Sequence, residues 1–228
     1  LSATHTPLTV SSGAGNDVLT LGAMSGATVD GGGGADSING FVDGVHFVLG
    51  NGQDSLLAHS QVAHVSGLTV AGDQGNDIVN ASDFGQVSID TGDGADVAIV
   101  TAELGTIQSG AGNDEVYVTA TTTVRNGGLV IDAGAGNDSI SFAVLREPGE
   151  EVYQNYTLIG GAGDDTINGS DPVMWQIDLF TFATGWGNDV VNGFDADRDK
   201  IVFSGTAGAG LNDPTDLTVT GDASHTVL

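Results

Sequence analysis

The 228-residue sequence contains no cysteine and only four basic residues, Arg125, Arg146, Arg198 and Lys200. Because it has no cysteine, a disulfide framework is excluded. Its formal net charge of -26 with so few cations excludes nucleic acid as a partner, since phosphate binding depends on Lys and Arg. No stretch approaches the roughly 20 apolar residues of a membrane span, so membrane insertion is not expected.

A targeting segment is also lacking. No basic stretch followed by an apolar run opens the sequence, and Leu1 is not an initiator residue. We therefore expect the sequence to be a fragment or a processed product of a longer protein.

Glycine and aspartate are abundant instead. The sequence has 37 Gly, and its acidic residues are 25 Asp against 5 Glu. Aspartate is short and favoured in turns, whereas a merely solvated acidic surface would use Glu as readily. The high net charge alone would favour disorder, but regularly spaced aliphatic residues argue against it. The acidic residues are therefore predicted to lie in turns of a folded chain.

These residues recur in the frame G-G-x-G-x-D-x-U, where U is apolar, and the segment 160–167 fits it at every position. Nine copies 18 to 27 residues apart end their turn at Asp17, Asp36, Asp54, Asp77, Asp96, Asp114, Asp138, Asp165 and Asp189. A recurring frame of this kind indicates a repeat architecture. Positions in each copy are counted below from this motif Asp, so that D−2 is two residues before it.

Glycine is nearly invariant at two positions of the frame. Position D−2 holds Gly15, Gly34, Gly52, Gly75, Gly94, Gly112, Gly136, Gly163 and Gly187. Position D−4 holds Gly13, Gly32, Gly50, Gly92, Gly110, Gly134, Gly161 and Gly185, with Asp73 as the one departure. Glycines two residues apart predict a tight turn with positive φ, or a backbone that closely approaches another group.

Apolar residues flank each turn. Position D−7 holds Val10, Val29, Phe47, Val70, Ile89, Ile107, Ile131, Leu158 and Phe182, and D+2 holds Leu19, Ile38, Leu56, Val79, Ala98, Val116, Ile140, Ile167 and Val191. Further apolar residues at two-residue spacing predict strands with one buried face. The fold class is therefore predicted as all-β, a parallel β-roll or β-solenoid, with Gly-Asp turns stacked along one edge and residues 1–192 forming the solenoid.

Such stacking would place the nine aspartates in one column, with coils roughly 4.8 Å apart. Neighbouring carboxylates at about 5 Å repel by about 0.8 kcal/mol in water and by about 3 kcal/mol at an intermediate dielectric. Four scattered basic residues cannot offset nine carboxylates, so a cation from outside is required. Carboxylate and carbonyl oxygens, without Cys or paired His, favour calcium over zinc or copper. Several Ca²⁺ ions are therefore predicted, with the motif Asp and the D−2 and D−4 glycines as the metal-site residues.

The frame resembles the haemolysin-type calcium-binding repeat of RTX proteins, G-G-x-G-x-D-x-U-x, over roughly residues 8–192. The resemblance implies a parallel β-roll in which calcium lies between successive turns, held by the motif Asp and by backbone carbonyls. The usual repeat recurs every nine residues, whereas here the motif recurs every 18 or more. Metal is therefore expected along one edge only, at eight junctions or fewer.

The segment 192–203 resembles the segment that closes RTX repeat blocks, so residues 193–228 are predicted to form a C-terminal capping segment. Asp195, Asp197 and Asp199 have the spacing of a loop that could bind a further ion. The loop is not an EF-hand, because Lys200 and Thr206 stand where Gly and Glu are required.

Several other residues have alternative interpretations. Asp30, Asp90 and Asp132 share position D−6, where they either add a metal ligand or cap the strand end. Asp73, Asp93 and Asp164 lie in turns but share no position, so solvated side chains are expected. Longer steps between copies predict surface loops, which are candidates for partner contacts, at residues 59–66, 119–127, 145–153 and 170–176.

Signals for catalysis and for other ligands are weak. His59 and His64 are five residues apart and do not fit H-E-x-x-H, and no catalytic residue is predicted. Trp175 and Trp186 are expected to pack rather than to bind sugar. Position D−3 would hold a ladder of Thr or Asn in an ice-binding solenoid, but it holds none here.

The sequence therefore favours a non-enzymatic, calcium-binding structural module of a secreted or surface-attached bacterial protein, of the surface-layer or adhesin type. It would fold and stiffen on extracellular calcium, because binding to the folded state alone drives folding. Partners other than calcium would be further copies, in a lattice or filament, or cell-surface polysaccharide. The alternative is an accessory RTX domain of a secreted enzyme, such as a polysaccharide-processing enzyme, a protease or a lipase.

Overall fold

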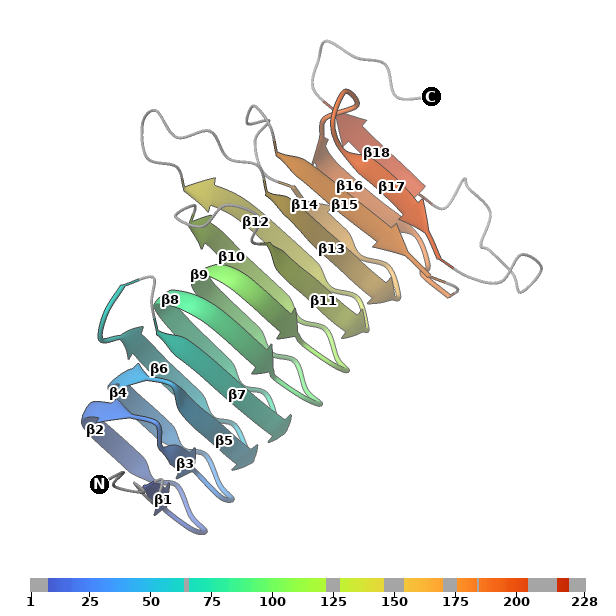
Figure 1. Ribbon diagram of the computed structural model, residues 1–228. Helices are drawn as coiled ribbons and strands as arrows, with labels where there is room; N and C mark the ends of the chain where they lie inside the picture. Colours follow the sequence, from blue (N-terminus) through green and yellow to red (C-terminus); the bar gives the residue numbers. More distant parts are fainter. Residues whose placement is uncertain are drawn as a thin grey trace.

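The computed structural model describes residues 8–63, 66–121, 128–145, 154–169, 176–183, 185–204 and 217–221. These residues form 18 β-strands, β1 to β18, and every pairing between them is parallel. Figure 1 shows the strands stacked in two layers along one axis, from β1 and β2 at one end to β17 and β18 at the other. The predicted all-β, parallel β-solenoid is confirmed.

The strands make two faces. The face before the Gly-Asp turns contains β1 (Thr9–Ser11), β3 (Thr28–Asp30), β5 (Val45–Asn51), β7 (Gly67–Gln74), β11 (Leu129–Ala135), β13 (Asn155–Ala162), β15 (Ile177–Phe182) and β17 (Lys200–Phe203). The face after the turns contains β2 (Val18–Ser25), β4 (Ser37–Asp43), β6 (Ser55–Ser60), β10 (Glu115–Thr121), β12 (Ser139–Leu145), β14 (Thr166–Asn168), β16 (Asp189–Phe194) and β18 (Leu217–Gly221). The longer strands β8 (Ile78–Asp90) and β9 (Val97–Gln108) pair in both faces.

The core is a thin apolar layer between the two faces. Alternate residues of each strand point inward, as the burial pattern of β4 and β7 shows. The apolar residues at D−7 and D+2 are buried in every coil except the first, where Val10 and Leu19 are half-buried. Equivalent residues pair directly between coils, for example Val29 with Phe47. The two-residue periodicity therefore identified the buried positions correctly.

The second edge is built differently from the Gly-Asp edge. There β8 and β9 run on from one face to the other with a register shift near Phe84, and Asp83 adopts a positive φ of 65°. Phe84 and Ala102 are fully buried at this bend. Apolar side chains therefore fill the second edge in the middle of the solenoid, where the Gly-Asp frame is absent.

The parallel pairing continues past residue 192. β17 pairs with β15, and β18 pairs with β16. Trp186 is buried at this end, with its ring centroid 4.9 Å from that of Phe182 and 5.2 Å from that of Phe203, so its predicted packing role is confirmed. The predicted domain boundary at residue 192 and the capping role of 193–228 remain predictions.

Some sequence predictions lie outside the described residues. These are Trp175, His64 and, within the loops predicted at 59–66, 119–127, 145–153 and 170–176, residues 64–65, 122–127, 146–153 and 170–175. Within the described part of the chain, no helix is long and apolar enough to cross a membrane.

Candidate metal centre

The Gly-Asp turns share one backbone conformation. All eight glycines at D−4 and all nine at D−2 have positive φ. Asp73, the one other residue at D−4, adopts the same left-handed conformation with φ of 74°. Short polar residues such as Asp tolerate this region better than most. The predicted positive-φ turn is therefore confirmed, including the copy that departs from the motif.

The glycines also allow adjacent turns to stack closely. A β-carbon on Gly112, whose φ is 142°, would overlap the carbonyl oxygen of Gly94 in the preceding coil. Gly136 and Gly163 would meet the preceding carbonyl in the same way. Both reasons for glycine therefore apply at D−2 from the second coil onward. In the first coil, Gly15 requires positive φ but has nothing within 4 Å of an added β-carbon.

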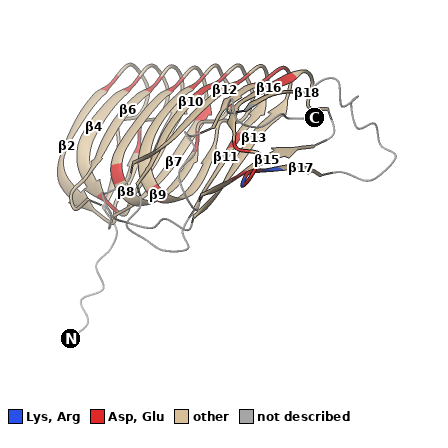
Figure 2. Cartoon of the chain, turned by 90° about the horizontal axis from the view of Figure 1, so that it is seen from above, with Lys and Arg blue, Asp and Glu red and all other residues tan. Residues whose placement is uncertain are grey.

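The motif aspartates form a single column along this edge. In each junction, the backbone N–H of one motif Asp donates a hydrogen bond to Oδ1 of the motif Asp in the next coil. The eight N···O distances, from the Asp17–Asp36 junction to the Asp165–Asp189 junction, lie between 2.7 and 2.9 Å. Figure 2 shows acidic residues recurring along one edge of the solenoid. One oxygen of each carboxylate from Asp36 onward is therefore held by the protein.

The other oxygen has no protein partner. Oδ2 is buried and lacks a hydrogen bond in all nine motif aspartates. Eight of these residues are at most 4% exposed, and Asp17, in the first coil, is half-buried. A buried carboxylate oxygen without a donor or a counter-ion is strongly unfavourable. The column is therefore incomplete as a purely protein structure.

The electrostatics of the column reflect this burial. Burial raises the pKa of Asp77, Asp138 and Asp189 to about 7 and that of Asp114 and Asp165 to about 6. The hydrogen bond from the preceding backbone amide opposes the rise in pKa, and repulsion from neighbouring carboxylates adds to it. Loss of hydration is thus the larger cost, and repulsion between coils is the smaller one.

These residues fit a hard divalent cation. Calcium takes six to eight oxygen ligands, and an orphaned carboxylate oxygen in each turn is the donor type that it prefers. Among the described residues, no three side chains of His, Cys, Asp or Glu form a group that could hold a metal ion. Backbone carbonyls of the glycine turns would therefore complete the set, as the sequence predicted. A bound ion would supply the positive charge that the column lacks.

A second ladder of side chains, at D−1, was not predicted from the sequence. At D−1, Oδ1 of Asn16 and of Asn76 accepts a hydrogen bond from the backbone N–H of the same position in the next coil, 3.0 Å away in both cases. Asn113, Asn137 and Asp164 do the same. The recurrence of Asn immediately before the motif Asp was the available signal. Asp164 therefore shares a position after all, although it is exposed as expected.

The other acidic candidates lie at the margin of the column. Burial raises the pKa of Asp132, and a hydrogen bond with the backbone of Gly134 in its own turn opposes the rise. That contact agrees with the capping interpretation of position D−6. Asp73, Asp90 and Asp93 are exposed and line one pocket of about 360 Å³ beside the turns.

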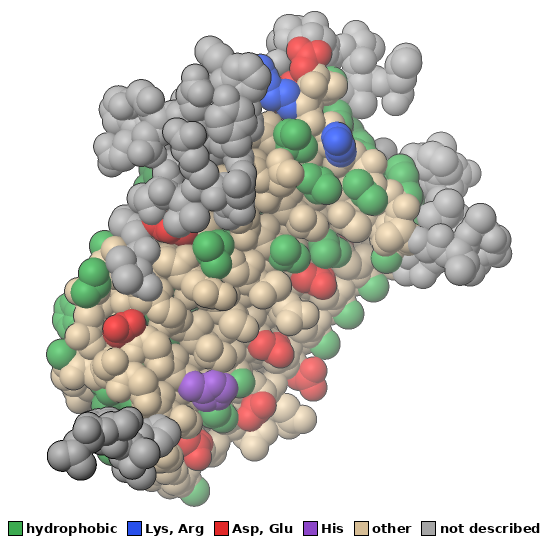
Figure 3. Space-filling model, in the orientation of Figure 1, with side chains coloured by type: hydrophobic (Ala, Val, Ile, Leu, Met, Phe, Trp, Pro, Cys, Tyr) green, Lys and Arg blue, Asp and Glu red, His purple; other side chains and the backbone are tan. Residues whose placement is uncertain are grey.

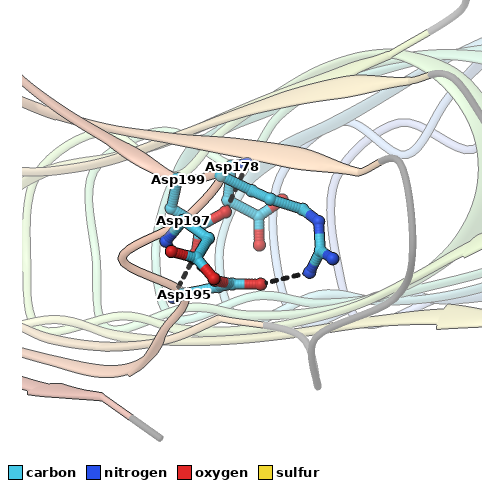
Figure 4. Close-up of polar contacts among 5 residues, drawn as sticks. Asp178, Asp195, Asp197 and Asp199 are labelled. Carbon is cyan, nitrogen blue, oxygen red and sulfur yellow. Dashed lines mark hydrogen bonds and ion pairs between the residues drawn. The ribbon is translucent and has the colours of Figure 1, made fainter. Parts of the chain in front are cut away.

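The C-terminal acidic loop is closed by protein contacts. Asp199 accepts the backbone N–H of Asp178 at Oδ1, 3.0 Å away, and that of Asp195 at Oδ2, 2.8 Å away. Asp195 in turn accepts the backbone N–H of Asp197 and forms an ion pair with Arg198. Figure 4 shows these carboxylates gathered around the loop. Asp195 and Asp199 therefore bind protein donors, and the further ion considered for this loop finds no support in the geometry.

His59 does not take part in a described metal group. Its ring stacks on that of Phe41, with centroids 5.5 Å apart. His64 lies outside the described residues, so the absence of a zinc site at the two histidines stays a prediction.

The fold and the column define a parallel β-solenoid whose stacked turns are built to hold cations. The family model for the RTX calcium-binding nonapeptide repeat (4 copies) matches residues 27–41, 130–142 and 157–171. The chain therefore carries RTX repeats, as the resemblance indicated, and is a calcium-binding structural module. Comparison with curated proteins and with solved structures found no match.

Proposed function

We propose that this chain is a non-enzymatic module of a secreted or surface-attached bacterial protein, of the surface-layer or adhesin type, that folds when it meets extracellular calcium. In the low calcium of the cytoplasm the carboxylate column would keep the chain unfolded. Outside the cell, calcium would bind between the turns and stabilise the stacked coils, because the folded state alone offers the sites.

One observation carries the proposal. All nine motif aspartates bury an oxygen that has no partner, in a chain whose only basic residues are four Lys and Arg. The two basic residues within the described part, Arg198 and Lys200, lie near the C-terminal end of the solenoid and away from most of the column. RTX repeats occur in secreted bacterial proteins, which supports the location.

The test is far-UV circular dichroism of the full chain with a chelator and then with calcium. The spectrum should change from coil to β as calcium is added. Magnesium at the same concentration serves as the control, because it demands a smaller and more regular site. A β spectrum that the chelator leaves unchanged would contradict the coupling of folding to calcium.

Self-association in a lattice or filament, or binding to cell-surface polysaccharide, is part of the same proposal. Exposed apolar side chains on the face after the turns support it. Among them are Phe41 on β4 and the paired Ile99 and Tyr117 on β9 and β10, which are 57%, 41% and 43% exposed. Hydrophobic side chains are spread over the surface in Figure 3. Electron microscopy of calcium-loaded protein should show sheets or filaments, and a uniform population of single solenoids would contradict assembly.

A further inference from the structure

Position D−5 of the repeat faces the orphaned oxygen of the column. At Gly31 and Gly72, a β-carbon would lie 2.9 Å from Oδ2 of Asp36 and Asp77, the motif aspartates of the same turns. The first atom of any side chain at D−5 therefore points at the oxygen that would receive the cation.

The chain does not keep glycine at this position. D−5 is Gly in three turns, Leu49 and Ala133 in two others, and Ser12, Thr91, Ser109 and Thr184 in the remaining four, of which Thr184 lies outside the described residues. Among the described residues at D−5, all but Ser12 are buried. The residue at D−5 thus differs from turn to turn, and at four turns it carries a hydroxyl group.

Two of the three described hydroxyl groups at D−5 have protein acceptors. Oγ of Ser12 donates to the carbonyl oxygen of Gly31, and Oγ1 of Thr91 donates to the carbonyl oxygen of Ser109, 3.0 Å away. In both cases the acceptor is position D−5 of the next coil. These hydroxyl groups therefore tie one coil to the next.

Ser109 departs from that pattern. Its side chain is 1% exposed and its Oγ has no hydrogen-bond partner, although Ala133 provides a D−5 carbonyl in the next coil. The motif aspartate of the same turn, Asp114, also buries an Oδ2 without a partner. This turn therefore brings together two buried oxygens, from different side chains, that no protein group satisfies.

We propose that Ser109 donates its hydroxyl oxygen to the cation at the Asp114 turn, as a ligand that the repeat motif does not include. The inference rests on the calcium binding of the proposed function. A hydroxyl oxygen is a hard, neutral donor of the kind that calcium accepts beside carboxylates and carbonyls. The Asp114 turn would consequently bind its ion more tightly than a turn with an aliphatic residue at D−5, such as the Asp54 turn with Leu49.

The experiment measures calcium binding by the full chain and its variants, using competition with a chromophoric chelator and equilibrium dialysis. Ser109→Ala should lower the affinity for one calcium ion by about tenfold, or abolish its binding. The affinities for the other ions should not change. Ser109→Thr, which keeps the hydroxyl group, should bind as the wild type does. Ser88→Ala is the matched control, because Ser88 is exposed on β8 and remote from the D−5 position.

The outcomes separate the two proposals. If the wild-type chain binds calcium and Ser109→Ala matches it in number and affinity of ions, Ser109 is not a ligand. In that case Ser109→Ala should instead stabilise the calcium-free chain, because it removes a buried polar group without a partner. If the wild-type chain binds no calcium, the proposed function fails as well. If Ser109→Ala does not fold, comparing Ser109→Thr with Ser109→Gly tests the same hydroxyl group.

Discussion

The backbone N–H of Asp138 donates a hydrogen bond to Oδ1 of Asp165, 27 residues later, at 2.9 Å. The same bond joins Asp36 to Asp54, only 18 residues later, at 2.7 Å. The length of a coil can therefore vary without changing the junction at the Gly-Asp edge. The extra residues of the longer coils leave the column intact.

Replacing one carboxylate should have opposite effects with and without calcium. In Asp138→Asn the amide oxygen can still accept the N–H of Asp114, but the negative charge is lost. We expect the affinity of the ions at this turn to fall at least tenfold, or about 1.4 kcal/mol. Without calcium the variant should be no less stable than the wild type, because it no longer buries a group whose pKa burial raises to about 7.

Calcium titrations check the first half of this prediction. Far-UV circular dichroism in chelator checks the second, because the variant should keep at least as much β structure as the wild type. Asp43→Asn is the control, since it removes the same charge from the end of β4, away from the column. Equal calcium affinity in Asp138→Asn and the control would contradict the assignment of the motif aspartates.

Two glycine-to-alanine variants should separate backbone strain from close contact. Gly15 has a φ of 115° and nothing within 4 Å of an added β-carbon, whereas in Gly112 that atom would overlap the carbonyl oxygen of Gly94. Gly15→Ala should therefore cost about 1–2 kcal/mol through strain alone. Gly112→Ala should cost at least about 3 kcal/mol, because the coils must also separate. Urea unfolding in saturating calcium measures both, and equal losses would contradict the packing argument.

The pH dependence of stability should reverse sign when calcium is present. Burial raises the pKa of Asp77, Asp138 and Asp189 from 3.8 to about 7, so between these values the folded chain binds more protons than the unfolded chain. Stability without calcium should therefore fall as pH rises from about 4 to 7. With calcium, protons compete with the ion, so stability should rise over the same range.

The fraction of β structure from pH 4 to 8, measured by far-UV circular dichroism with calcium and with chelator, checks this reversal. Below the raised pKa, the calcium affinity should fall by about tenfold per pH unit for each proton that the ion must displace. If stability changed with pH in the same way with calcium and with chelator, the motif carboxylates would not be ligands of the ion.

The acidic loop at the end of the solenoid should be indifferent to calcium. Asp199 accepts the backbone amides of Asp178 and Asp195, so Asp199→Ala leaves two donors without their acceptor. The variant should lose about 2–3 kcal/mol, and Asp199→Asn, which keeps one acceptor oxygen, should lose less. Urea unfolding should give the same loss of unfolding free energy at two calcium concentrations that both saturate the sites. A lower calcium affinity in Asp199→Ala would instead show that this loop binds an ion.

Much of the architecture could be predicted from spacing alone. The repeat frame, as at Asp165, predicted the turns, and the spacing of apolar residues such as Val29 and Ile38 predicted the buried faces of the strands. Both signals depend only on position in the sequence. The continuous pairing of β8 and β9 across the second edge could not be predicted, since no motif marks it.

The chemistry of the column was predicted less completely. Repulsion between aspartates was expected to dominate, whereas burial is the larger cause of the raised pKa of Asp77. Spacing gives the distance between coils, but not how far water is excluded from each carboxylate. The amide partner of Oδ1 and the role of Ser109 likewise depend on where bonds point, which a residue pattern does not encode.

The parallel stacking also determines how the solenoid would respond to mechanical force. Hydrogen bonds between coils run along the long axis of the molecule, so tension applied to the two ends would open one junction at a time. An 18-residue coil would release about 60 Å of extended chain, together with the ion at its turn. Calcium concentration would then set the force at which each coil yields, and a module of this kind would lengthen in steps under load.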